Sequence, residues 1–186
     1  MYIRNAWKYG KPLKIIQAGE FFVSNANEFI GTLLGSCISV TLHDSVNKIS
    51  GLNHFMLPGR ISSVDIFEDR SAKYGITAIN TLIDEMEKKG ALRKDIVAKI
   101  FGGGSVLEYE KRTNTIPMDN IRLARIMLEM EDIPIIQSDV GGKYTRKLLL
   151  DVLSGKVYCR RTTNKKIMEK VKKEEIEYVS RSFNKG

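Results

Sequence analysis

Cysteine and histidine are both scarce in this chain, which has two of each among 186 residues. The cysteines, Cys37 and Cys159, are too few for a disulfide framework, and no Cys/His cluster has the spacing of zinc ligands. This usage is typical of a reducing compartment, where an isolated cysteine remains free to react. We therefore expect a cytoplasmic protein without a zinc site.

Long apolar runs are absent as well. The N-terminal stretch MYIRNAWKYGKPL has no apolar segment of the secretory kind, and no stretch approaches the roughly 18 consecutive apolar residues of a membrane span. Hydrophobic residues make up 42% of the chain and charged residues 28%, which is the profile of a soluble globular protein. We expect one domain and no membrane insertion.

Acidic residues are missing from the N-terminal end and outnumbered at the C-terminal end. Residues 1–14 carry a net charge of +4 and residues 160–186 of +5, so that the intervening body sums to about −1 within a total of +8. A nucleic-acid-binding face would place its excess of positive charge on the folded body. The distribution instead predicts solvated basic ends and no nucleic-acid partner, although the same ends could contact an acidic protein.

The remaining pattern predicts an α+β protein. Alternation and short apolar runs predict strands over residues 15–23, 33–43, 49–56, 95–101 and 133–137, with a hairpin of 147–152 and 156–161. Helical spacing predicts helices over 76–89, ended by Gly90, and over 120–130, capped by Asp119. A charged helix is expected over 165–178, and residues 59–74 are expected to form a loop.

The predicted strands 33–43 and 49–56 bring Cys37 close to His54. A two- or four-residue loop centred between positions 45 and 46 would place the two residues directly opposite each other, with Cβ atoms roughly 4.5–5.5 Å apart. A three-residue loop would shift the register by one and put the two side chains on opposite faces. The alternation favours the first arrangement.

That arrangement sorts the hairpin into two faces. One face is a candidate core and carries Ile38, Val40, Leu42, Ile49, Gly51 and Phe55. The other is mostly polar and carries Cys37, Ser39, Thr41, His43, Lys48, Ser50, Leu52 and His54. We expect the second face to be the wetter one.

Cys37 and His54 have both a structural and a catalytic interpretation. Free cysteine is among the most buried residue types, and a lone histidine is more often a hydrogen-bonded structural group. Gly35 and Ser36 before the cysteine favour catalysis, because a turn there can direct amide N–H groups at an oxyanion. An adjacent imidazole would also activate a thiol that is only slightly ionised at neutral pH.

Four motifs, taken together and in this order, resemble the CheD family. They are LGSC at 34–37, NHFMLP at 53–58, KIFGG at 99–103 and DVGGKYTRK at 139–147, and the resemblance runs from about residue 13 to 161. It implies a layered α+β cysteine-hydrolase fold, with a mixed β core flanked by helices, similar to the catalytic domain of cytotoxic necrotizing factor. It also divides the chain into a basic N-terminal arm (1–12), a deamidase domain (13–162) and a charged C-terminal helix or tail (163–186).

The activity implied by this resemblance is that of a protein-glutamine glutaminase, whose Cys-His chemistry calls for no metal and no organic cofactor. Members of the family hydrolyse glutamine side chains of methyl-accepting chemotaxis proteins to glutamates, and many also bind the phosphatase CheC. The alternative is a non-catalytic adaptor that binds a CheC-type phosphatase or chemoreceptors. Because an adaptor would be free to lose the pair, the presence of both Cys37 and His54 favours the enzyme.

The resemblance also assigns roles to residues. The nucleophile falls on Cys37, its base on His54 and the third residue on Thr32, with Gly35 and Ser36 supporting the oxyanion. Some members have one more residue between the threonine and the cysteine, and strict counting would then land on Gly31.

Four further features receive structural interpretations. The run 102–104 lacks the Lys-Ser/Thr of a phosphate loop and is expected to be a strand-end turn near the site. Arg146 and Lys147 are expected on a solvated edge, with contact to acidic substrate flanks as the alternative. His43 is expected to be exposed to solvent, and Cys159 to be structural.

Overall fold

The computed structural model describes residues 4–57, 61, 63, 66–105 and 116–183. The described residues form an α+β fold with two five-stranded sheets and three α-helices. The strands are β1 (Arg4–Lys8), β2 (Lys11–Ile15), β3 (Glu20–Ser24), β4 (Phe29–Leu34), β5 (Ile38–Asp44), β6 (Ile49–His54), β7 (Ile96–Gly102), β8 (Ile135–Val140), β9 (Thr145–Asp151) and β10 (Val157–Thr162). The helices are α1 (Arg70–Lys88), α2 (Ile116–Met130) and α3 (Lys165–Phe183), with a short 3-10 helix at Arg93–Asp95.

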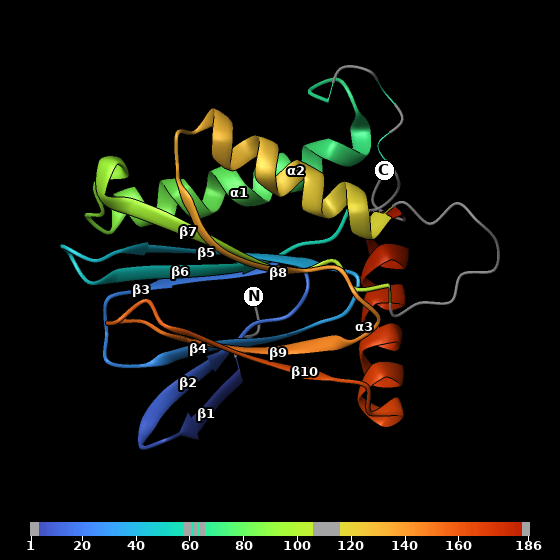
Figure 1. The fold of residues 1–186 in the computed structure, drawn as a ribbon, viewed down its shortest axis with the longest axis horizontal. Helices are drawn as coiled ribbons and strands as arrows, with labels where there is room; N and C mark the ends of the chain where they lie inside the picture. Colours follow the sequence, from blue (N-terminus) through green and yellow to red (C-terminus); the bar gives the residue numbers. More distant parts are fainter. Residues whose placement is uncertain (1–3, 58–60, 62, 64–65, 106–115, 184–186) are drawn as a thin grey trace.

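The elements stack in layers. The first sheet has the strand order β3-β6-β5-β7-β8, and the second sheet has the order β1-β2-β4-β9-β10. Each sheet contains one parallel pair of strands among antiparallel pairs. Helices α1 and α2 cover the outer face of the first sheet, while the second sheet lies against its other face (Figure 1). Helix α3 stands across one end of both sheets (Figure 1).

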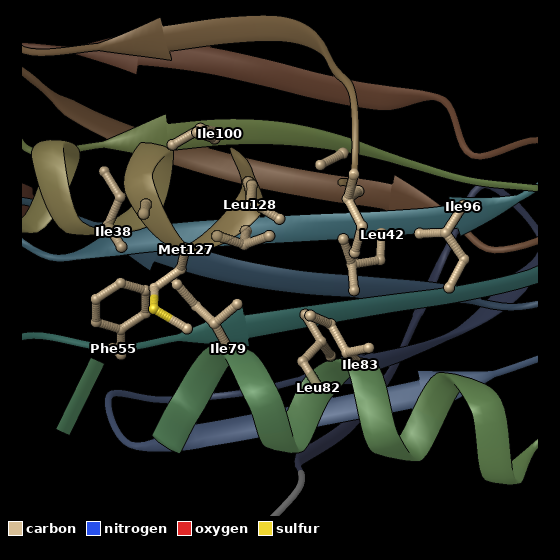
Figure 2. Close-up of a cluster of buried hydrophobic side chains, with 14 of the residues drawn as sticks. Ile38, Leu42, Phe55, Ile79, Leu82, Ile83, Ile96, Ile100, Met127 and Leu128 are labelled. Atoms are coloured by element: carbon tan, nitrogen blue, oxygen red, sulfur yellow. The ribbon is translucent and has the colours of Figure 1, made fainter. Parts of the chain in front are cut away.

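The larger hydrophobic core lies between the helices and the first sheet. Figure 2 shows Ile38 and Leu42 of β5 facing Ile79, Leu82 and Ile83 of α1. The face that alternation predicted as core is therefore confirmed, because these β5 residues, Ile49 and Phe55 belong to the same buried cluster.

The other face of the hairpin is also buried, so the prediction that it is the wetter side is wrong. Ser39 and Leu52 are fully buried and Thr41 is 3% exposed, because the second sheet packs against this face. Ile30 of β4 and Leu150 of β9 pack with Leu52 between the sheets. Most of the polar side chains of this face thus lie inside the protein and need internal hydrogen-bond partners.

The hairpin register differs from the predicted one by two residues. Thr41 faces Leu52, and the bridge between Ile38 and Phe55 continues the same register. Cys37 is therefore not directly opposite His54. Because the shift is an even number of residues, both side chains stay on the same face.

Hydrogen bonds within the loop explain this register. The Asp44 carboxylate accepts the backbone N–H groups of Val46 and Asn47 at 2.9 Å each, and the Asn47 side-chain amide at 2.8 Å. Lys48 follows with a φ of +56°, which closes a loop between Asp44 and its partner Ile49. A polar side chain that bonds the backbone ahead of it stabilises this four-residue turn, which is centred one residue later than predicted.

Several predicted boundaries are corrected. The strand expected over 15–23 is two strands, β2 and β3, in different sheets. Part of the loop expected over 59–74 belongs to α1, and another part lies outside the described residues. Asp119 is not an N-cap, since α2 begins at Ile116 and Asp119 lies in its first turn. Residues 4–8 and 11–12 of the expected basic arm belong to the β1–β2 hairpin, and β2 pairs with β4.

Candidate active site

His54 and Thr32 connect the two sheets at one end of the molecule. His54 is the last residue of β6, Thr32 lies in β4, and the Thr32 Oγ1 and His54 Nδ1 atoms are 2.8 Å apart. The Thr32 hydroxyl donates to the carbonyl oxygen of Ile16 at 2.9 Å, so it accepts from His54. The proton of the neutral imidazole therefore sits on Nδ1, and Nε2 is left with a free lone pair.

The Nε2 atom is available as a proton acceptor, in an imidazole that burial makes a weaker base than usual. It is buried without a hydrogen-bond partner among the described residues. Burial lowers the pKa of His54 to about 3, so the imidazole is neutral at physiological pH. A neutral imidazole with one tautomer and an unpaired nitrogen can take a proton from a nearby thiol.

Cys37 follows the turn between β4 and β5 and is completely buried. Gly35 and Ser36 form that turn, which interrupts the strand expected over 33–43, so that Cys37 precedes β5 instead of lying within it. Burial raises the pKa of the Cys37 thiol well above its ordinary value, and the carboxylate of Glu175 raises it further. The resting thiol is consequently protonated.

Residues 35–37, called the Cys37 turn below, are held in place by two neighbouring elements. The backbone N–H groups of Gly103 and Gly104 donate to the carbonyl oxygens of Cys37 and Gly35, both at 2.7 Å. The Asn120 side chain of α2 donates to the Ser36 carbonyl at 3.1 Å and accepts the N–H of Leu57 at 2.9 Å. The run 102–104 is thus a strand-end turn beside the candidate site, as predicted, whereas the role of Asn120 had no signal in the sequence.

Glu175 of α3 lies against the same turn and is 2% exposed. Its Oε1 atom accepts the backbone N–H of Gly35 at 3.2 Å and that of Cys37 at 3.1 Å. Its Oε2 atom accepts the Ser36 hydroxyl at 2.7 Å. Two amide donors that converge on one oxygen beside a thiol form the geometry of an oxyanion hole.

One pattern in the sequence of the terminal helix could have indicated Glu175. Val171, Glu175 and Tyr178 are spaced by four and three residues, so they share one face of a helix. A carboxylate on an otherwise apolar stripe indicates a specific polar partner, because burying an unpaired charge is costly.

Two cavities adjoin His54. One of about 80 Å³ lies between His54 and α3 and is also lined by Gln17, Leu33 and Glu174. The other, of about 400 Å³, lies beside α1 and is lined by Phe21, Phe55, Tyr74 and Ala78 as well as His54. Tyr178 lines both cavities.

The predicted residues fall into two groups of contacts, one that joins Thr32 to His54 and one that joins the turn of Gly35, Ser36 and Cys37 to Glu175. Thr32, not Gly31, supplies the hydroxyl that bonds His54. Gly35 and Cys37 donate their amides to one oxygen atom, whereas Ser36 contributes its hydroxyl. No hydrogen bond joins the Cys37 thiol to Nε2 of His54 in the part of the chain that is described.

The other sequence candidates lie elsewhere. Arg146 is fully buried and pairs with Asp139 at 2.9 Å, so the solvated edge predicted for it is wrong. His43 is half-buried beside the Ser50 hydroxyl at 2.8 Å, which corrects the expectation of a solvent-exposed side chain. Burial and Asp139 raise the pKa of Cys159 to about 11, in keeping with a structural cysteine.

The described residues contain neither a metal-binding cluster nor a membrane-spanning helix. Within them, no group of three or more His, Cys, Asp or Glu side chains could hold a metal ion. None of the helices in this part of the chain is both long and apolar enough to cross a membrane.

A thiol beside converging amides, together with an imidazole whose tautomer is fixed, is the type of site in which cysteine enzymes form acyl intermediates. The chain belongs to the CheD family: the family described as CheD chemotactic sensory transduction matches residues 56–161. The resemblance found in the sequence motifs is thereby confirmed.

Relatives match most of the chain. A protein of Hahella chejuensis, named a probable chemoreceptor glutamine deamidase CheD, is 39% identical over 154 residues, covering 82% of this chain and 71% of the relative. A Sulfurimonas denitrificans protein of the same name is 40% identical over 148 residues, covering 79% of this chain and 92% of the relative. Among solved structures, YfiH of Bacillus licheniformis has a TM-score of 0.40 and 13% identity over 66% of this chain and 49% of that one, too weak to support an argument.

Proposed function

We propose that this protein hydrolyses glutamine side-chain amides of methyl-accepting chemotaxis proteins to glutamate and ammonia, with Cys37 as nucleophile and His54 as base. The observation that carries the proposal is the convergence of the Gly35 and Cys37 amides on one oxygen atom next to the Cys37 thiol. The names of the relatives support the substrate.

In the proposed reaction, Nε2 of His54 takes the proton of the Cys37 thiol, and the sulfur attacks the carboxamide carbon. The Gly35 and Cys37 amides then stabilise the oxyanion. Imidazolium returns the proton to the departing ammonia, which leaves a thioester. Water activated by the same imidazole cleaves the thioester, so that glutamate is released and the thiol is restored.

Three finer statements belong to the same proposal. The reaction takes place in the cytoplasm, the fold is similar to that of the cytotoxic necrotizing factor catalytic domain, and a CheC-type phosphatase is a further partner. The scarcity of cysteine supports the first statement, and the family resemblance in the LGSC and NHFMLP motifs supports the other two.

The test incubates the protein with the cytoplasmic helices of a cognate receptor and follows conversion of glutamine to glutamate by peptide mass spectrometry. Cys37→Ala is expected to abolish conversion, since it removes the nucleophile. Cys159→Ala is the matched control and is expected to retain activity, because the Cys159 thiol bonds Asp139 and takes no part in the hydrogen bonds of the turn at Gly35, Ser36 and Cys37. Conversion that continues in Cys37→Ala would contradict the mechanism, and no conversion by the wild type across several receptors would favour the adaptor.

A further inference from the structure

Helix α3 is held against the candidate site by few apolar contacts. Of its described side chains, Val171 is the buried apolar one, while Met168, Tyr178 and Val179 are half-buried. Helix α1, in contrast, buries the apolar residues Ile79, Leu82, Ile83 and Met86. An element with few buried apolar contacts opens at low cost in free energy.

Glu175 is the polar centre of this contact. An apolar side chain would pack at this buried position without the cost of removing a carboxylate from water. None of the ion pairs among the described residues includes Glu175, and its charge is balanced by backbone amides and the Ser36 hydroxyl. The contact between Glu175 and the turn at residues 35–37 is therefore typical of carboxylate recognition and not of core packing.

The bound group is chemically the product of the proposed reaction. A glutamate side chain at this place has one oxygen on the Gly35 and Cys37 amides, where the substrate carbonyl would lie. The Ser36 hydroxyl donates to the other oxygen, and it also lies 3.4 Å from the Met56 sulfur. With a carboxamide in place, the same hydroxyl can accept from the NH₂ group and turn its proton toward Met56.

We propose that α3 is a built-in substrate analogue, which holds Glu175 where the target glutamine binds and must be displaced before a receptor helix can enter. This inference rests on the proposed function for the identity of the incoming helix. It defines the substrate as a glutamine on a helix, with an apolar residue four positions before it in the place of Val171.

The cavities around His54 are consistent with replacement of α3 by a receptor helix. Tyr178 lines both the cavity of about 80 Å³ under α3 and the cavity of about 400 Å³ beside α1. Departure of α3 removes that shared wall, so that the two cavities join into one groove with His54 at its base. A groove of this kind accepts a helix by its i, i+3 and i+4 side chains.

Docked α3 also suppresses the proposed hydrolysis of glutamine by Cys37. The Glu175 carboxylate disfavours ionisation of the Cys37 thiol, whose pKa burial has already raised. Release of α3 removes this charge and leaves the amides of Gly35 and Cys37 free for substrate.

The first test converts the analogue into a substrate by Glu175→Gln. Cys37 would then attack the carboxamide introduced at position 175, ammonia would leave, and water would cleave the thioester to regenerate Glu175. We expect residue 175 to be recovered as glutamate when Cys37 is present and as glutamine in the Cys37→Ala double variant, at a rate independent of protein concentration. Glu169→Gln, on the exposed side of α3, is the matched control and is expected to remain glutamine.

The second test releases α3 in the full-length chain. Glu175→Ala is expected to raise kcat/KM for receptor helices about tenfold, because a larger fraction of the enzyme molecules has α3 released and can bind a receptor helix. Val171→Ser, which keeps the Glu175 charge, is expected to raise it about threefold by the same mechanism. Alkylation of Cys37 by iodoacetamide should accelerate in both variants, measured in a Cys159→Ala background.

The outcomes separate this inference from the proposed function. If the wild type deamidates receptor helices while the glutamine introduced by Glu175→Gln stays unchanged and neither releasing variant is faster, the inference is overturned and the function stands. If no variant acts on receptors but the introduced glutamine is converted to glutamate in a Cys37-dependent way, the α3 inference is supported and the receptor assignment fails.

Discussion

At the scale of residues, a threonine fixes the state of a histidine. The Thr32 hydroxyl donates its hydrogen bond to the carbonyl oxygen of Ile16, so it can only accept a hydrogen bond from Nδ1 of His54. Nε2 is thereby kept as the basic nitrogen without a charged partner. Thr32 thus acts through His54, as a positioning residue for the proposed reaction.

We predict that Thr32→Val lowers kcat for glutamine hydrolysis by about 10- to 100-fold, with KM little changed. Valine preserves the shape of the side chain within β4 but leaves the Nδ1 proton of His54 without an acceptor. Steady-state kinetics on receptor helices check this. Thr32→Ser keeps the hydroxyl and should retain most of the activity. A wild-type kcat in Thr32→Val would show that Thr32 does not position His54.

At the scale of elements, the end of β7 supports the Cys37 turn. Gly102 has a φ of +115°, and a Cβ added there would lie 2.2 Å from the carbonyl oxygen of Cys37. The backbone of the glycine run therefore approaches the turn more closely than any side chain would permit. This close approach is what positions the Gly103 and Gly104 amides for their bonds.

We predict that Gly102→Ala lowers the free energy of unfolding by about 2–3 kcal/mol and strongly reduces activity, because steric clash adds to backbone strain. Gly10→Ala is the control, since Gly10 has a similarly positive φ of +77° but nothing within 4 Å of the added Cβ. It should cost about 1 kcal/mol and leave activity unchanged. Urea unfolding and receptor deamidation measure both effects; equal losses in the two variants would refute the role of the close approach.

At the scale of the whole molecule, enclosing the polar face between two sheets makes stability depend on pH. Burial lowers the pKa of His54 to about 3 and also lowers the pKa of His43 below its usual value. The unfolded chain, in which both histidines have ordinary pKa values, therefore binds more protons in mildly acidic solution. Stability must fall as the pH decreases through this range.

We expect the free energy of unfolding to drop by about 2 kcal/mol through His54 alone between about pH 7.5 and about pH 5. Urea titrations at successive pH values measure the slope. His54→Asn should remove most of it and His43→Asn a smaller part, since His43 is only half-buried. A slope unchanged in His54→Asn would show that this imidazole is not buried in its neutral form.

Local pattern by itself determined much of this protein. Alternation placed Ile38 and Leu42 on the core face and kept Cys37 and His54 on one side, because a strand has a period of two. The four motifs LGSC, NHFMLP, KIFGG and DVGGKYTRK, taken together, pointed to the family that also matches residues 56–161. These features depend on neighbouring residues alone.

Tertiary structure decided the remainder. The hydrogen bonds of Asp44 set the register two residues away from the predicted one, and the second sheet converted an expected wet face into a buried one. Glu175 meets Cys37 across 138 positions of sequence. No local period encodes such a meeting, since it depends on how α3 packs across the ends of both sheets (Figure 1).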